Sequence, residues 1–209
     1  MNNPEYAKIG DKKYKINTDY RVGIECDAIG RDTSIGDYER ALAIIYKIFG
    51  EEGLNDTKNH AKLLELAEKY LSCGQKIDTS KNSKPDMDFK YDFNLIKTSF
   101  RSDYGIILEQ EKMHWWDFYW LLNGLSNSEL GNTCILNKVR DIRTRDPKDI
   151  KDKKERDALI EAKKIWALPH EKPKPTKEQL ESIENLKRII GRKWLYGCRR
   201  ISNKDNLRN

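Results

Sequence analysis

The sequence lacks the features that mark membrane, exported and fibrous proteins. Its 209 residues hold no apolar run near the roughly 18 residues that a membrane-spanning helix needs. The first twenty residues alternate charged and apolar side chains, so we expect no secretory signal. No internal repeat with a period of about 20–50 residues is present. These absences favour a soluble globular protein of the cytoplasm.

Catalytic and metal-binding motifs are missing as well. The four cysteines form no Cys-x-x-Cys pair, and the three histidines have no metal-ligand spacing. A glycine-rich phosphate loop, a dinucleotide fingerprint and a Gly-x-Ser-x-Gly turn are all absent. We therefore expect no enzyme activity, no cofactor and no metal. The scattered cysteines are expected to be small buried residues.

One pattern is reminiscent of the carboxylate–lysine site of metal-dependent nucleases. Pro85-Asp86 would form its first part, and Glu161 with Lys163 its second. Such sites normally lie on adjacent strands, where the carboxylates hold Mg²⁺. Here Glu161 and Lys163 fall within a predicted helix, in which side chains two positions apart diverge. The pattern is therefore not interpreted as a nuclease site.

Positive charge is concentrated in the C-terminal two-fifths of the chain. The net charge is +6, of which residues 126–209 carry +9 and residues 1–125 carry −3. A cluster of cations can bind nucleic acid by releasing condensed counterions. Acidic residues are interleaved throughout this region, however, which is typical of a solvated helical surface. We favour the solvated surface and keep nucleic-acid binding as the alternative.

The spacing of apolar residues predicts a mainly α protein. Short alternating runs around Gly10-Asp11 predict a β-hairpin over residues 7–16. Asn17, Thr18 and Asp19 are good N-cap residues for the helix that follows. Gly50 is expected to end the second helix. Apolar residues at helical spacing predict helices at 20–29, 37–49, 55–73, 91–104, 126–142 and 155–168. The strongest apolar run lies at 108–125. Residues 75–88 are predicted to form a surface loop.

Proline separates the C-terminal part from the rest. Residues 1–168 form the predicted helical domain, and the three prolines of residues 169–175 predict an extended spacer. Residues 176–209 are predicted to form a basic helix and tail, in which Trp194 belongs to an apolar stripe. The predicted architecture is a single helical domain with a small N-terminal hairpin and a tethered C-terminal helix.

The most informative segment is an aromatic block. Five aromatic residues fall within six positions, namely Trp115, Trp116, Phe118, Tyr119 and Trp120. A helix that is apolar all round is either central to a core or covered by partners. Part of the block can therefore be a docking surface, because Trp and Tyr dominate interface hot spots. A stacking platform for single-stranded nucleic acid is less favoured, since residues 115–122 contain no lysine or arginine.

An ordered series of motifs runs over residues 1–169. The motifs are Asn-Thr-Asp-Tyr-Arg at 17–21, Cys-Gly at 73–74, Tyr-Asp-Phe at 91–93, Tyr-Gly-Ile at 104–106, His-Trp-Trp-x-Phe at 114–118, Gly-Leu at 124–125, Ile-Arg at 142–143, Lys-Asp-Lys-x-Glu-Arg at 151–156 and Ala-Leu-Pro at 167–169. In order and spacing this series resembles a bacteriophage family called gene product fifteen. Residues 170–209 depart from the pattern as a C-terminal extension.

The resemblance implies a tail assembly protein of long-tailed phages. Such proteins are taken to be chaperones that coat the apolar helices of the tape measure protein until tail tube subunits replace them. The implied partners are the tape measure protein, the tail tube protein or a second tail assembly chaperone, and further copies of the chain. The implied location is the host cytoplasm during assembly and not the mature virion. A permanent structural role in the tail is the other alternative.

Combined with the aromatic block, the resemblance singles out candidate partner-binding residues. These are Trp115, Trp116, Tyr119, Trp120 and Trp194.

Overall fold

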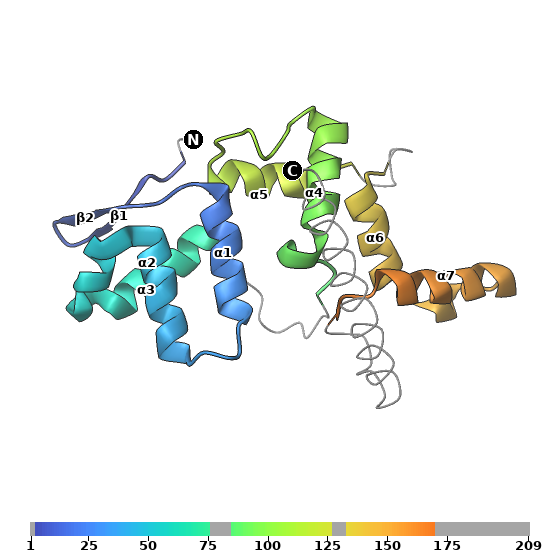
Figure 1. The fold of residues 1–209 in the computed structure, drawn as a ribbon, viewed down its shortest axis with the longest axis horizontal. Helices are drawn as coiled ribbons and strands as arrows, with labels where there is room; N and C mark the ends of the chain where they lie inside the picture. Colours follow the sequence, from blue (N-terminus) through green and yellow to red (C-terminus); the bar gives the residue numbers. More distant parts are fainter. Residues whose placement is uncertain (1–2, 76–84, 127–132, 170–209) are drawn as a thin grey trace, which may run out of the picture. The chain divides into compact units, whose positions relative to one another are not determined.

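The computed structural model describes residues 3–75, 85–126 and 133–169 (Figure 1). Most of the predicted loop at 75–88, nearly all of the predicted spacer and the whole predicted C-terminal helix, with Trp194, lie outside these residues. In the described part the chain forms one antiparallel hairpin and seven α-helices. The prediction of a mainly α fold with an N-terminal hairpin is confirmed.

The N-terminal half consists of the hairpin and three helices. Gly10, at φ +59°, occupies the first central position of the hairpin turn, where a positive φ matches the twist of the strands. Asp19 caps the first helix by accepting a hydrogen bond from the Arg21 N–H at 2.9 Å. The elements are β1 (Tyr6–Ile9), β2 (Lys12–Lys15), α1 (Tyr20–Arg31), α2 (Asp37–Asn55) and α3 (His60–Leu71). Helix α2 packs against both α1 and α3 (Figure 1).

The regular helical geometry breaks at Gly50, the residue predicted to end the second helix. The residue has φ +66° and ψ −159°, which is far from helical, yet the chain returns to helical geometry directly after it. Glycine tolerates this backbone conformation because it has no Cβ. Helix α2 is therefore kinked at Gly50 and continues to Asn55. The kink leaves the Ile48 carbonyl to accept a hydrogen bond from the Asn17 N–H, at 2.8 Å.

The C-terminal half of the described chain holds four helices, which are α4 (Phe89–Tyr104), α5 (Trp115–Asn123), α6 (Ile135–Thr144) and α7 (Lys153–Trp166). Helix α4 begins two residues before the prediction because Asp88 caps it, accepting from the N–H groups of Lys90 and Tyr91. The helix predicted at 126–142 begins only at Ile135, after Cys134 in the capping position. No helix in the described part of the chain is long and apolar enough to cross a membrane.

A buried ion pair joins the helices of this half. The Arg143 guanidinium forms two hydrogen bonds with the Asp92 carboxylate, at 2.6 and 2.8 Å, and both side chains are almost fully buried. Arg143 also donates to the carbonyls of Trp166 and Asp86, at 2.8 and 2.9 Å. One side chain of α6 therefore ties together the start of α4, the segment before it and the end of α7. Two parallel hydrogen bonds of this kind fix geometry as well as charge.

We predict that Arg143→Met lowers the free energy of unfolding by about 3–5 kcal/mol, because it leaves the Asp92 carboxylate buried without a partner. Arg140→Met is the matched control on the same helix, since Arg140 pairs with Asp86 in a solvent-accessible position. It should cost at most about 1 kcal/mol. Denaturant unfolding followed by circular dichroism measures both. Equal losses in the two variants would contradict the assigned role of Arg143.

A second cluster holds the hairpin against the helices. The Asp56 carboxylate accepts hydrogen bonds from Tyr14 at 2.6 Å, Lys12 at 2.9 Å and Asn59 at 3.1 Å. These bonds, with that from Tyr14 contributing most, lower the pKa of Asp56 well below its usual 3.8. The inward face of the hairpin is thereby fixed to the turn between α2 and α3.

The lowered pKa of Asp56 predicts acid sensitivity of the hairpin. A carboxyl group with a lowered pKa in the folded state contributes stability above its unfolded pKa, and loses it as the pH falls through the folded pKa. Protection of the hairpin amides from hydrogen exchange should therefore fall below about pH 4 in the wild type. In Asp56→Asn the protection should be low already at neutral pH and should change less with acid. Identical pH profiles would exclude Asp56 as the clamp.

Candidate functional site

The aromatic block forms α5, and the start of this helix is bonded to the segment before α1. The Trp115 N–H donates to the Thr18 carbonyl at 2.8 Å, and the Tyr20 N–H donates to the Met113 carbonyl at 3.0 Å. His114 caps α5, since its Nδ1 accepts from the Trp116 N–H at 3.0 Å. These bonds join the sequence motifs at 17–21 and 114–118 and fix how α5 is rotated about its axis.

One side of α5 lies in the core. Trp115 is only 4% exposed, and its indole N–H donates to the Leu71 carbonyl at 2.9 Å. Phe118 is fully buried and stacks on Tyr20 and Phe100, with ring centroids 4.8 and 5.3 Å apart. The helix thus lies between α1 and α4, as Figure 1 shows. Stacked aromatic pairs of this kind stabilise a core beyond the area that they bury.

The other side of α5 presents a group of three aromatic residues, here called the aromatic face: Trp116, Tyr119 and Trp120. Trp120 is 48% exposed, and the other two are half-buried. The rings support one another, since Tyr119 and Trp120 meet edge to face at 5.7 Å. Trp116 is anchored by its indole N–H, which donates to the Tyr70 carbonyl at 2.9 Å. The exposed rings are therefore held in fixed positions.

The structure thus divides the candidate partner-binding residues. Trp115 lies in the core and offers almost no surface to a partner. For this residue the structure matches the alternative in which the aromatic block is part of the core. Trp116, Tyr119 and Trp120 lie together on the accessible side of the same helix. Trp194 lies outside the described residues. The sequence pattern did not separate the two sides, because every residue from 118 to 122 is aromatic or leucine.

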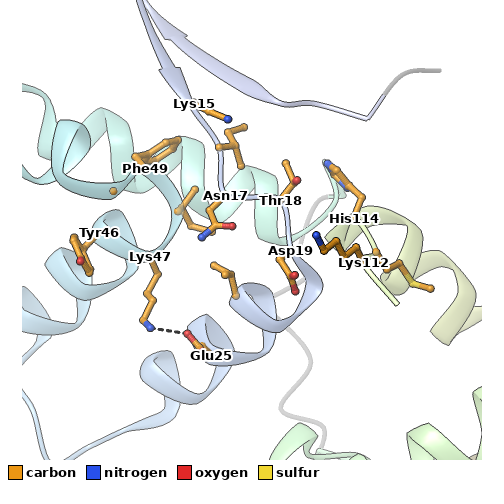
Figure 2. A pocket seen from close by; sticks show the side chains of 15 residues that line it. Lys15, Asn17, Thr18, Asp19, Glu25, Tyr46, Lys47, Phe49, Lys112 and His114 are labelled. Atoms are coloured by element: carbon orange, nitrogen blue, oxygen red, sulfur yellow. Dashed lines mark ion pairs between the residues drawn. The ribbon is translucent and has the colours of Figure 1, made fainter. Parts of the chain in front are cut away.

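An open cleft of about 790 Å³ lies beside the aromatic block and has no counterpart in the sequence predictions (Figure 2). Its lining comes from four separate segments: the end of β2 with the residues that follow it, α1, the kinked part of α2, and residues 112–114. The Asn-Thr-Asp residues at 17–19, Gly50 and His114 were each singled out in the sequence, but nothing there indicated that they lie around one cleft. Spatial assembly from distant segments is the reason that sequence reasoning missed the cleft.

Four of the ionisable groups that line the cleft already serve the fold. Glu25 pairs with Lys47 at 2.6 Å, the ion pair drawn in Figure 2. Asp19 caps α1 and pairs with Arg21, and both ring nitrogens of His114 contact backbone groups. A catalytic acid or base needs a proton-accepting atom directed at the substrate. Glu25, Lys47, Asp19 and His114 are therefore all engaged by neighbouring groups of the protein.

The residues of the nuclease-like pattern each have another role. Asp86 pairs with Arg140 at 2.8 Å, and Glu161 pairs with Lys164 at 2.6 Å. Lys163 donates to the Arg143 carbonyl at 2.7 Å. Within residues 3–75, 85–126 and 133–169, no three His, Cys, Asp or Glu side chains are grouped so that they could hold a metal ion.

The three cysteines of the described chain are buried thiols. Cys26, Cys73 and Cys134 are free and buried, as predicted, whereas Cys198 lies outside the described residues. Burial raises the pKa of Cys26 and of Cys73 to about 12. Because the thiolate is the reactive form, these two thiols are poor nucleophiles at neutral pH.

The position of α5 depends on a glycine that allows close approach. A Cβ on Gly23 of α1 would overlap the indole ring of Trp115, whereas a Cβ on Gly30 of the same helix would meet no atom within 4 Å. We predict that Gly23→Ala destabilises the protein by about 1–3 kcal/mol through overpacking. Gly30→Ala, the matched control, should stabilise it by up to about 1 kcal/mol. Thermal unfolding measures the change in stability of each variant, and the two changes should have opposite signs.

Comparisons with known proteins place the chain in context. The sequence model of a family described as Bacteriophage Gp15 protein matches residues 3–168. The match spans the hairpin, all seven described helices and the whole aromatic block. No curated protein and no solved structure matches the chain.

Proposed function

The chain belongs to the bacteriophage Gp15 family, and from this premise we propose that it is a tail assembly chaperone that binds apolar helices of the tape measure protein. The observation that carries the proposal is the aromatic face of α5. It presents Trp116, Tyr119 and Trp120 to solvent from a helix whose opposite side is locked in the core. Exposed aromatic clusters of this kind mark sites of protein–protein contact.

The chemistry of the aromatic face fits an apolar helix. Trp116 and Trp120 are four positions apart, so both lie on one line along α5. Fixed aromatic rings bury a large area on binding while losing little side-chain entropy, which is the reason that Trp and Tyr act as anchors. An amphipathic helix with residues at spacings of three and four would lay its apolar stripe across them. The tape measure protein supplies long helices of this type.

The charged residues suit a protein that keeps an apolar partner soluble. Charged residues make up 35% of the chain, and a mixed charged surface opposes aggregation. In the proposed role the protein is not an enzyme. It associates with other copies along the tape measure chain, acts in the host cytoplasm and gives way to the tail tube protein or works beside a second chaperone. It is then absent from the finished virion, whereas a permanent tail component would be found in purified particles.

The decisive test removes the aromatic face and leaves the core intact. Trp120→Ala and the double change Trp116→Ala/Trp120→Ala should weaken tape measure binding at least tenfold, because a hot-spot residue contributes about 2 kcal/mol or more. Co-purification of the tape measure protein with each variant measures the loss. Helical content by circular dichroism should stay at the wild-type level.

Two further variants make the result specific. Tyr38→Ala removes an aromatic residue of α2 that is more exposed than Trp120, and should leave binding unchanged. Trp115→Ala should lower the free energy of unfolding by about 3–5 kcal/mol, as expected of a core residue. Wild-type binding by the double variant, or loss of its helical structure, would refute the assignment of the aromatic face.

A further inference from the structure

The solvent side of the β1–β2 hairpin is a second candidate surface, separate from the aromatic face. Ala7 and Tyr14 point into the core, so the alternation of a strand places Tyr6, Lys8, Lys13 and Lys15 on the opposite side. We call these four residues the lysine face. All four are exposed, and no carboxylate among the described residues pairs with any of the three lysines. Lys12, on the inward side, is by contrast paired with Asp56.

The arrangement of the lysine face is unfavourable in isolation. Lys8 and Lys13 are directly opposite each other across the two strands. The Ile16 N–H donates to the Glu5 carbonyl at 2.8 Å, which makes Glu5 and Ile16 a hydrogen-bonded pair. Hydrogen-bonded and non-hydrogen-bonded pairs alternate along an antiparallel ladder, so Lys8 and Lys13 form a non-hydrogen-bonded pair. Side chains are closest in such pairs, and like charges there are destabilising. A negatively charged partner would remove this repulsion.

The hairpin also has a free edge. Strand β2 packs against α2, whereas β1 pairs with β2 alone in the described structure. The alternation of the ladder directs the N–H and C=O groups of Tyr6 and Lys8 away from β2. Unpaired groups in this arrangement can take up another strand. Because Tyr14, Asp56 and Lys12 fix the inward side, the edge is presented by a rigid element.

We propose that the lysine face is a docking surface for an extended acidic segment of a partner protein, which adds to β1 as a third strand. Side chains at alternate positions of such a strand point to one side of the sheet. Carboxylates at these positions would lie on the same side as Lys8 and Lys13 and would repeat every two residues, as the side chains on one face of β1 and β2 do. This inference rests on the hairpin alone and stands apart from the proposed binding of the tape measure protein through α5.

Two features favour an acidic protein segment over nucleic acid. The free edge of β1 offers alternating donors and acceptors that only another peptide backbone can match along its length. The ring of Tyr6, which a base would need for stacking, already has the ammonium group of Lys13 over it at 3.6 Å.

The test uses the full chain and a labelled peptide of alternating Glu and Thr, about ten residues long, whose binding is followed by fluorescence anisotropy. The wild type should bind it, and the double change Lys8→Glu/Lys13→Glu should weaken binding at least tenfold. Lys62→Glu/Lys69→Glu, on exposed positions of α3, is the matched control and should bind like the wild type. A peptide of alternating Lys and Thr should bind to Lys8→Glu/Lys13→Glu in preference to the wild type.

Three comparisons complete the test. N-methylation of alternate residues of the acidic peptide should abolish binding, since strand addition needs the N–H groups. Lys13→Glu alone should raise the melting temperature or leave it unchanged, because it turns a repulsive cross-strand pair into an attractive one. An oligonucleotide of deoxythymidines of equal charge should bind more weakly than the peptide. The inference is refuted if the wild type does not bind the peptide, if N-methylation has no effect or if the oligonucleotide binds more tightly.

Discussion

The burial of Trp115 and Phe118 is the constraint on which the candidate site depends. These two rings hold α5 between α1 and α4, with Gly23 providing the room for the Trp115 indole. Once that side of the helix is fixed, helical geometry places Trp120 on the accessible side, with Trp116 half-buried beside it and stacked on Tyr70. An exposed tryptophan would be an aggregation hazard on a mobile segment. On a helix locked in this way it is a preorganised contact residue.

The motifs that carry the family resemblance serve mainly to build this scaffold. Tyr20 and Arg21 donate to the Leu108 carbonyl and so tie α1 to the segment before α5. Asp92 and Arg143, which belong to two different motifs, form the buried ion pair that joins α4, α6 and the end of α7. A family defined by such residues shares a fold. The contacts proposed for this chain use side chains that the fold leaves accessible, namely the aromatic face and the lysine face.

The periodicity of apolar residues predicted which helices and strands form better than it predicted where they begin and end. The helices around 20–29 and 91–104 were found because their apolar stripes are clear. Asp19 was recognised as a cap of the first helix, whereas Asp88, which caps α4, was predicted to lie in the preceding loop. Gly50 was correctly identified as the point where the second helix breaks, but the helical segment that follows it to Asn55 was not predicted, because a glycine can kink a helix as well as end one. The sequence could not predict which side of α5 is buried or that the cleft exists, since both depend on contacts between residues far apart in the chain.

The role proposed for the aromatic face is to hold an apolar helix of the partner in solution. Co-expression with the tape measure protein, followed by size exclusion with light scattering, tests it most directly. The expected result is a soluble complex whose mass corresponds to many copies of this chain on each tape measure chain. A tape measure protein that precipitates while this protein elutes alone would contradict it.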